Sequence, residues 1–269
     1  MGVLKTLTDE YFGEDIRKED LIDISDLEVE IVEFTDMNGK FHKYGYRVID
    51  GDPDEMAKTL KTFIERVIEL RGPECSLNDV DVSNQKMMCY EDEESVNYGV
   101  FEESPFNGDI SGWDVSSVEN MDLMFWNAKS FNQDISRWNV SNVENMKNMF
   151  WGAISFNQPL DKWDVSSVKN MRDMFRYATS FNQDISRWNV SSVENMNSMF
   201  YKAKSFNQDI SRWDVSNVEN MGWMFDDAES FNQDISGWNV SNVKHMRDMF
   251  DNTPLKNNNK LPKWYLDRQ

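Results

Sequence analysis

The chain has 269 residues and a formal net charge of −20, with 48 acidic against 28 basic side chains. A chain this acidic repels nucleic acid and anionic lipid, so neither is expected as a partner. No apolar run in the sequence approaches the about 20 residues that a membrane-spanning helix needs.

The N-terminal residues contain no apolar signal core, so we expect the chain to stay in the cytosol of the cell that makes it. Met1, Gly2 and Thr6 fit the loose myristoylation pattern, which leaves lipidation at Gly2 as an alternative. A single acyl chain binds membranes only weakly, and the acidic residues that follow supply no second signal. Residues 8–24 are expected to form a short helical segment.

Residues 27–50 have the pattern of a β-hairpin. Apolar and acidic residues alternate from Leu27 to Phe34, an Asn38-Gly39 turn follows, and an extended segment runs on to Asp50. The hairpin is therefore predicted to have one face packed on the core.

A helix is predicted next, between Asp52 and Gly72. Asp52 is placed to cap it, Pro53 occupies the first helical position, and Gly72 ends it. Because a hairpin and one amphipathic helix can cover each other, residues 1–72 are interpreted as a small α+β domain. The apolar stripe of the helix comprises Met56, Leu60, Phe63, Ile64, Val67 and Ile68.

Residues 73–105 are interpreted as a degenerate coil that begins the repeats. The string DVSNQKMM, Asp81 to Met88, echoes DVSNVENM in the full units, and terminal repeats are commonly atypical. Residues 1–105 hold 27 acidic and 11 basic side chains, a net charge of −16, which we interpret as a solvated surface. Cys75 and Cys89 are expected to stay reduced, with a disulfide between them as the alternative.

Six copies of a 25-residue unit occupy residues 106–255, and the period never slips. Such a period indicates a small unit stacked on copies of itself. When each unit is numbered from its phenylalanine, apolar residues fall at positions 1, 5, 8, 10, 13, 16, 19, 20 and 23. The units begin at Phe106, Phe131, Phe156, Phe181, Phe206 and Phe231.

Each unit is predicted to be a strand followed by a helix. Positions 8 and 10 alternate as in a strand, and positions 13 to 23 are spaced by three and four as on one helix face. Serine at position 11 is expected to cap the helix, paired with glutamate three residues later in four copies. The other two copies carry Lys169 and Lys244 at that place. The fold class predicted is α/β: a β/α solenoid of six repeats behind the small α+β domain.

The strands of successive units should stack in parallel about 4.8 Å apart, with like side chains above like. Asparagine at position 2 is expected to form a ladder that satisfies backbone groups of its own and neighbouring coils. This structural ladder comprises Asn107, Asn132, Asn157, Asn182, Asn207 and Asn232.

The strings WNVSNVENMKNMF and SFNQDISRW resemble the repeat of the BspA-like leucine-rich-repeat surface proteins, a type abundant in mycoplasma lipoproteins. The resemblance covers about 150 of the 269 residues. It implies a leucine-rich-repeat-like solenoid with a binding role at a cell surface, and it brings no catalytic residue. The chain departs from the bacterial members in lacking their secretion signal.

The chain offers few residues for chemistry. Catalytic and metal sites need histidine, cysteine or paired acids that converge, and neither histidine has a repeated acidic or thiol partner. Methionines at positions 16 and 19 have core spacing, which favours packing over soft-metal binding. The stretch from Asp50 to Glu55 lacks the glycine and ligand spacing of a calcium loop. We therefore expect a protein that is not an enzyme and needs no cofactor.

Two surfaces are candidates for binding a protein partner. On the strand side, positions 7 and 9 form a polar ribbon, in which alternating Asp and Asn at position 9 also relieves charge repulsion. On the helix side, large apolar residues at positions 18 and 21 either bind a partner or tuck against the next coil. The strand-side candidates are Arg137, Lys162, Asp164, Arg187, Asn189, Arg212 and Asp214; the helix-side candidates are Leu123, Trp126, Trp151, Tyr201 and Trp223.

Residues 256–269 are predicted to cap the last coil, with Pro254 interrupting its helix and Leu261, Trp264, Tyr265 and Leu266 covering the open end. The function expected is a non-catalytic protein–protein interaction solenoid. The alternative is a structural component of a larger assembly, such as a virion or a cell-surface coat.

Overall fold

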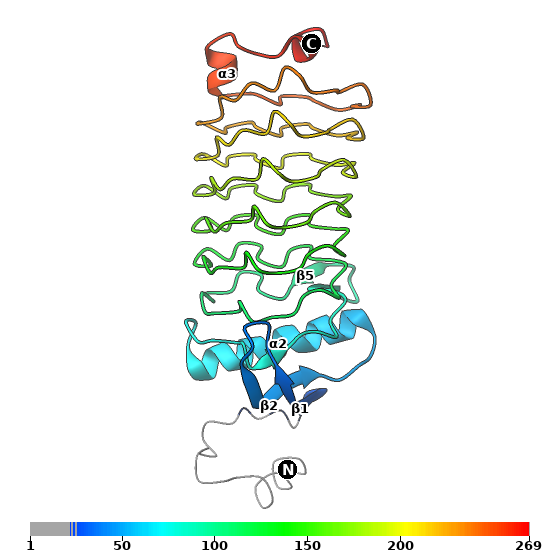
Figure 1. The fold of residues 1–269 in the computed structure, drawn as a ribbon, viewed down its shortest axis with the longest axis vertical. Coiled ribbons are helices and arrows are strands. Elements are labelled where there is room, and N and C mark those ends of the chain that lie inside the picture. The colour runs from blue at the N-terminus through cyan, green and yellow to red at the C-terminus, as the bar shows by residue number, and fades with distance from the viewer. Residues whose placement is uncertain (1–21, 23, 25, 269) are drawn as a thin grey trace, which may run out of the picture.

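The computed structural model describes residues 22, 24 and 26–268, which form an elongated body with the repeats arranged along its long axis (Figure 1). The predicted lipidation signal at Gly2 and nearly all of the predicted helical segment 8–24 lie outside the described residues. The elements are β1 (Val29–Thr35), β2 (Phe41–Val48), α2 (Pro53–Arg71), β3 (Val80–Asp81), β4 (Cys89–Glu91), β5 (Asn97–Gly99), α3 (Pro254–Asn257) and α4 (Lys263–Leu266).

The small N-terminal α+β region is present as predicted. β1 and β2 pair antiparallel around a turn in which the Asp36 carboxylate accepts the N–H groups of Asn38 and Lys40 at 3.0 and 2.9 Å. α2 begins after Asp52, whose carboxylate accepts the Asp54 N–H at 3.1 Å, and it ends at Gly72. Its predicted apolar stripe is buried in every member.

Parallel pairing connects the N-terminal β1–β2 hairpin to the repeats. β3 pairs in parallel with β2, and Met87 then forms a parallel bridge to Asn120 of the first repeat. Residues 73–105 therefore occupy the place of a coil before the first repeat.

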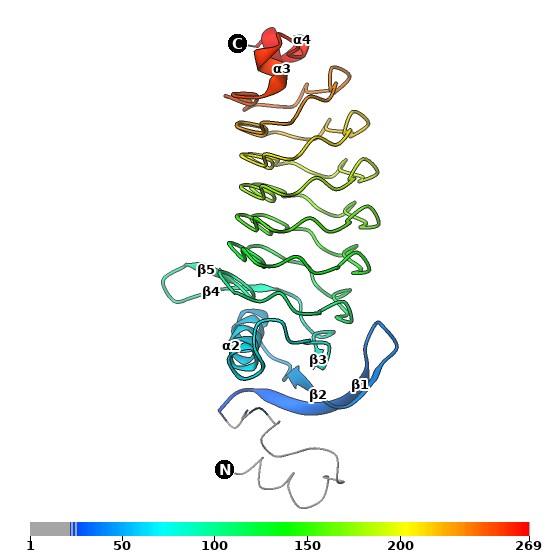
Figure 2. The ribbon, with the colours of Figure 1, turned by 90° about the vertical axis from the view of Figure 1, so that its left-hand side faces the viewer.

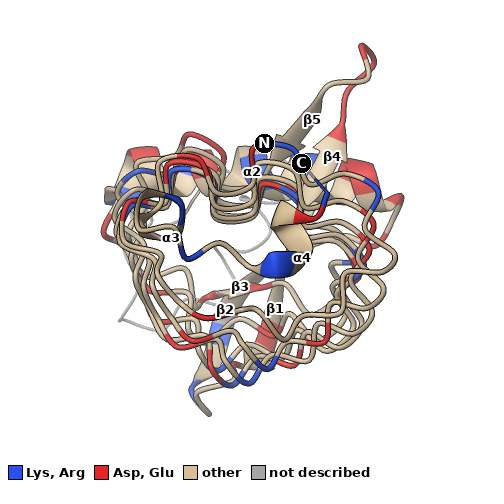
Figure 3. Ribbon diagram, turned by 90° about the horizontal axis from the view of Figure 1, so that it is seen from above, with Lys and Arg blue, Asp and Glu red and all other residues tan. Residues whose placement is uncertain are grey.

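This preceding coil carries an insertion. Met88 and Phe101 make the backbone bonds that positions 16 and 20 make in full repeats, but they are 13 residues apart instead of 4, which leaves nine extra residues. The extra residues form the β4–β5 hairpin, which projects from the body (Figures 2 and 3).

The six repeats lie in register, and the prediction of like side chains above like is confirmed for the aromatic columns. Rings at position 20 follow one another at 5.5 to 5.8 Å, and position 8 indoles such as Trp113 and Trp138 are 6.3 Å apart with planes 4° from parallel. Each position 8 indole N–H also donates to a carbonyl of the preceding coil, as Trp138 does to Ile110 at 3.1 Å. The apolar positions of the unit are buried along the whole stack.

The prediction of a helix at positions 13 to 23 is wrong, because residues 106–253 contain no helix. The N–H groups at positions 16, 18, 20 and 22 donate to the next coil, as Met146 does to the Asn170 carbonyl at 3.0 Å. The N–H groups between them close tight turns, as Trp151 does to the Asn148 carbonyl at 3.0 Å. Alternate amides therefore leave the segment, whereas a helix would keep them within it.

The backbone φ angles explain why these segments form turns and not a helix. Positions 18 and 22 have positive φ in all six repeats, a left-handed conformation that ends a right-handed helix wherever it occurs. These residues are Leu123, Asn127, Asn148, Gly152, Asp173, Tyr177, Ser198, Lys202, Trp223, Asp227, Asp248 and Asn252.

The predicted strand at positions 8 to 10 and the serine–glutamate caps are also wrong. Alternation does hold there, with Trp138 and Val140 buried around an exposed Asn139, but the parallel bridges join position 15 of successive coils. The Ser141 N–H donates to the Asn139 side chain at 3.2 Å in a local turn. With no helix to cap, Glu144 instead pairs with Lys169 of the next coil at 2.7 Å.

The C-terminal residues cover the last coil in a different way from that expected. Pro254 begins the short helix α3, and α4 places Trp264 6.4 Å from Trp238 at the end of the indole column. Tyr265 is buried, whereas Leu266 is 55% exposed and takes no part in the cover. Arg268 donates to carbonyl oxygens of the last coil.

Candidate functional site

The repeats differ from one another mainly on one side. Positions 1, 2, 8, 10, 11, 13, 16, 19 and 20 each hold one residue type in all six copies, whereas positions 17, 18, 21, 22 and 24 each hold four or five. We call the surface built by positions 17, 18, 21 and 22 the variable face. It lies on the side from which the β4–β5 hairpin projects, because that hairpin is inserted between positions 16 and 20 of the preceding coil.

An aromatic ladder forms the first part of the variable face. The rings of Trp126 and Trp151 stack at 4.7 Å with planes 13° apart, and Tyr177 and Tyr201 continue the series edge-to-face at 5.5 and 5.6 Å. All four side chains are half-buried, since each ring covers part of its neighbour. Part of each side chain therefore remains exposed, and tryptophan and tyrosine are residue types enriched at interfaces.

Two cations lie within this ladder. The Arg176 guanidinium is 4.3 Å from the centre of the Tyr201 ring, and the Lys202 ammonium is 5.1 Å from the same centre. Lys202 also lies 3.8 Å from the Asp227 carboxylate. The sequence interpretation missed Tyr177 and Lys202, because position 22 does not lie on the outward face of the predicted helix. It missed Arg176 at position 21 because only large apolar side chains were selected there.

Carboxylates form the far end of the variable face. Burial, helped by Asp227, Asp251 and Asp248, raises the pKa of Asp226 to about 6. No ion pair holds Asp226 within the part of the chain that the structure describes. The face thus changes along the stack from aromatic to cationic and aromatic, and then to acidic.

The two other helix-side candidates lie at separate places on the same face. Trp223 is 37% exposed, with the Arg247 guanidinium 5.9 Å from its ring centre. Leu123 is half-buried, and its carbonyl lies so close to Gly99 that a Cβ there would come within 2.0 Å. The structure therefore brings Trp126, Trp151 and Tyr201 into one ladder and leaves Trp223 and Leu123 beside it.

The strand-side candidates form a second surface, which we call the polar face, at positions 7 and 9. Its four basic side chains are exposed, and none forms an ion pair among the described residues. Asp164 and Asp214 accept bonds from the serines two residues later, which lowers the pKa of both carboxyls. The basic members are Arg137, Lys162, Arg187 and Arg212.

The N-terminal hairpin occupies one end of the polar face. The Met37 N–H donates to the Gly112 carbonyl at 3.0 Å, and a Cβ at Gly112 would lie 2.9 Å from an Asp36 oxygen. Glycine at position 7 of the first repeat is thus required by the hairpin. The other position 7 glycine, Gly237, has open space around it.

Asparagine side chains connect the coils in two columns. At position 2, the Oδ1 of each of the first five asparagines accepts the backbone N–H of the next coil's asparagine at 2.8 to 2.9 Å. A second column at position 15, which the sequence interpretation missed, holds the parallel bridges, and its side chains accept the N–H two residues later. The same asparagine in five copies at position 15 was the available signal.

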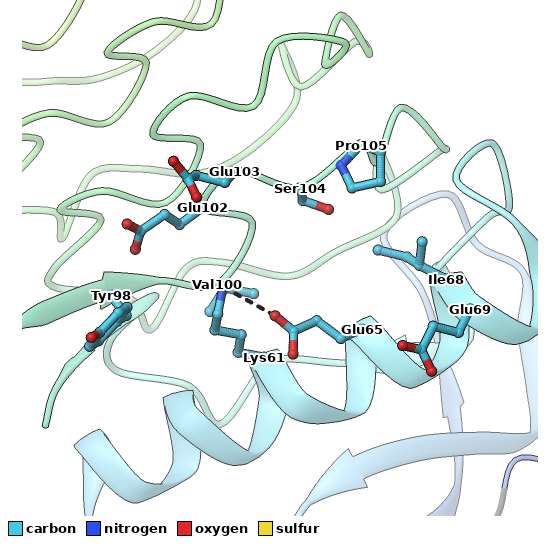
Figure 4. Close-up of a pocket in the computed structure, with 10 residues that line it drawn as sticks. All are labelled: Lys61, Glu65, Ile68, Glu69, Tyr98, Val100, Glu102, Glu103, Ser104 and Pro105. Atoms are coloured by element: carbon cyan, nitrogen blue, oxygen red, sulfur yellow. Dashed lines mark ion pairs between the residues drawn. The ribbon is translucent and has the colours of Figure 1, made fainter.

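A groove of about 570 Å³ lies between α2 and the preceding coil (Figure 4). The Lys61 ammonium donates to the Gly99 carbonyl at 3.0 Å and lies 3.4 Å from Glu65. Burial raises the pKa of Glu102, whose carboxylate accepts the Gly99 N–H at 2.9 Å. Because no histidine or cysteine lines the groove, it offers no nucleophile–base pair of that kind.

Residues able to do chemistry are scattered. Within the described residues, no group of three or more histidine, cysteine and acidic side chains is placed to hold a metal ion. Both cysteines are free, and burial raises the pKa of Cys89 to about 12. His42 pairs with Asp36 at 2.9 Å inside the N-terminal hairpin. No helix among the described residues is long and apolar enough to cross a membrane.

These features define a repeat protein: a small α+β region followed by 25-residue repeats with regularly spaced aromatic stacking. Residues 92–175 and 156–264 match the family described as "Mycoplasma protein of unknown function, DUF285", and together the two matches span more than half of the chain. The chain belongs to this family. No curated protein and no solved structure matches it.

Proposed function

We propose that this protein is a non-catalytic binding protein that holds a protein partner on its variable face. The observation that carries the proposal is the concentration of sequence variation at positions 17, 18, 21 and 22, which each hold four or five residue types in a unit with nine invariant positions. Elsewhere in the unit only position 24 varies as much. A uniform column presents the same groups at every coil, so a partner could shift by one coil at little cost. A face whose chemistry changes along the stack favours one partner in one register.

The side chains of this face suit protein recognition. Tryptophan, tyrosine and arginine supply most of the binding energy at protein interfaces. Here they form a connected group, with Trp126, Trp151 and Tyr201 in one ladder and Arg176 against the Tyr201 ring. The polar face is the weaker candidate for binding. Its residue types at positions 7 and 9 are nearly the same in every coil, and the N-terminal β1–β2 hairpin covers one end of it.

The repeat region is further proposed to be a solenoid related to the leucine-rich-repeat proteins of the BspA type. The parallel bridges between successive coils and the position 2 asparagine column support this relationship. A binding role at a surface, of a cell or of a larger assembly, would follow from it.

The test is capture of the partner from the native cell by the wild-type chain and by two triple variants. Trp126→Ala with Trp151→Ala and Tyr201→Ala should abolish capture, whereas Arg137→Ala with Arg187→Ala and Arg212→Ala, on the polar face, should leave it intact. Thermal unfolding of both variants checks that the fold survives. Retained capture by the aromatic variant, or loss only in the polar-face variant, would eliminate the variable face as the binding surface.

A structural role in a virion or coat is the competing proposal. Sedimentation of a native extract separates the two, since a coat component would be found only in large particles and a binding protein also as a free chain. The cover provided by Trp264 and Arg268 weighs against end-to-end assembly of copies.

A further inference from the structure

The variable face has negative charge at both ends. At its N-terminal end, the β4–β5 hairpin carries Glu91, Glu93 and Glu94 at an exposed tip that extends beyond the outline of the coils (Figure 3). None of these three glutamates is in an ion pair within the described part of the chain. At the other end, Asp226 lies among further carboxylates and is likewise unpaired.

The acidic tip is held in shape by the backbone around Asp92. Its carboxylate accepts the N–H groups of Glu94 and Val96, each at 2.9 Å, and Ser95 adopts a positive φ of 61°. Gly99 at the base of the hairpin abuts Leu123 of the first repeat. The hairpin therefore has an ordered turn at its tip and is packed against the first repeat at its base, at one end of the variable face.

Between the two acidic ends lies the aromatic ladder with its two cations. The preceding coil and the fifth repeat are five coil steps apart, so at about 4.8 Å per step they are separated by roughly 24 Å along the stack. An extended peptide spans that distance with about seven residues, at about 3.3 Å per residue. A segment of this length would contact the ladder along its whole course.

We infer that the variable face binds an extended protein segment that carries lysine or arginine at both ends and apolar side chains between them. The inference rests on the proposed function and adds the chemistry of the partner. Basic ends would lie against the hairpin tip and against Asp226, while apolar side chains would contact the edges of Trp126 and Trp151. A nucleic acid or an anionic membrane does not fit, because either would be repelled at both ends.

The raised pKa of Asp226 supports this geometry. Its carboxylate is partly desolvated and faces other carboxylates, so a bound cation would relieve the repulsion there. The nearby cations supply only part of this relief. Lys202 opposes the rise in the pKa of Asp226 but also lies 3.8 Å from Asp227, while Arg247 pairs with Asp248 and Lys256 contacts Asp251.

The probe is a phage-displayed library of random linear peptides, selected on the full chain. Peptides that survive selection are then measured against two variants with the same change of net charge. The first is Glu93→Gln with Glu94→Gln and Asp226→Asn. The control is Asp114→Asn with Asp164→Asn and Asp214→Asn, on the polar face, where the other three repeats already carry asparagine.

The expected result is a set of peptides with two basic groups separated by apolar residues. They should bind the first variant about tenfold more weakly than the wild type and bind the control like the wild type. Equal weakening by both variants, or none by the first, would overturn the inference.

The same peptides separate this inference from the proposed function. One outcome is that selected peptides lack basic residues and still lose binding to the variant in which Trp126, Trp151 and Tyr201 are replaced by alanine. That result would overturn the inference of a basic partner but would support the variable face as the binding surface. Peptides that bind that variant as they bind the wild type, or a selection that enriches nothing, would count against both.

Discussion

The Trp264 indole N–H donates to the carbonyl oxygen of Ile235 at 3.1 Å, as the Trp238 indole does to Ile210 one coil earlier. A residue from a short terminal helix thus takes the place that position 8 would occupy in a seventh repeat. Trp264 is therefore the last indole of the position 8 column, and it covers the core of the last coil.

Trp264→Ala is therefore expected to destabilise the end of the stack. Removal of a large, mostly packed ring and its hydrogen bond should cost about 3 kcal/mol in the free energy of unfolding. Urea unfolding gives the magnitude, and amide exchange should show faster opening confined to the last coils. Leu266→Ala is the matched control, since that side chain is 55% exposed and its removal should change stability by less than about 0.5 kcal/mol. Equal effects of the two substitutions would contradict the capping role.

Two asparagines of the position 2 column, Asn182 and Asn232, are expected to contribute unequally to the free energy of unfolding. The Asn182 Oδ1 accepts the Asn207 N–H at 2.9 Å and the Gln208 amide at 3.0 Å, whereas among the described residues no further repeat donates to Asn232. Asn182→Ala should cost about 2 kcal/mol, because it leaves a partly buried N–H without its acceptor. Asn232→Ala should cost much less. The measurement is chemical unfolding of both variants, and similar losses would mean that the column does not hold the coils together.

The packing of the repeats could be predicted from the sequence, but their backbone could not. Identical residues every 25 positions fix which side chains lie above one another, so the tryptophan, phenylalanine and asparagine columns follow from counting. The hairpin and α2 carried their own turn and cap residues, Asn38-Gly39 and Asp52-Pro53.

The absence of helices could not be predicted, because successive tight turns return side chains to the core every three or four residues, as a helix does. The left-handed positions that distinguish the two hold Leu123, Tyr177 and Trp223 as well as Gly152, so no glycine pattern marks them. The same error hid part of the variable face: Tyr177 joins the ladder of Trp151 and Tyr201 only because the backbone turns at that position.

The charges at position 14 form a repeating series that a substitution can break. Lys86, Lys169 and Lys244 are each separated by two glutamates, and each lies within 3.0 Å of a glutamate on an adjacent coil. Lys169→Glu would place five glutamates in one column and should lower the thermal midpoint at low ionic strength. Screening at high salt should remove most of the loss. The neutral Lys169→Gln should fall between the two, and a loss independent of salt would show that charge repulsion is not its cause.

Asp226 gives the stability of the protein a dependence on pH whose sign follows from its raised pKa. Because burial and neighbouring carboxylates raise that pKa from 3.8 to about 6, the folded chain binds this proton more tightly than the unfolded chain does. The contribution of Asp226 to stability is therefore most favourable below about pH 4, falls as the pH rises to about 6, and stays constant above that.

Asp226→Asn should remove this dependence. At pH 7 the variant should be more stable than the wild type by about 1 kcal/mol, since solvent reduces the effect at a partly exposed carboxylate, and near pH 3 the two should be alike. Asp214→Asn is the control, because hydrogen bonds from Ser216 lower the pKa of Asp214 rather than raise it. Replacing this carboxylate should therefore not increase the stability of the protein at pH 7. Unfolding curves of the three chains at pH 3, 5 and 7 make the comparison. A variant no more stable than the wild type at pH 7 would show that Asp226 is not strained by the carboxylates around it, and would remove the electrostatic reason for expecting a basic partner at that end.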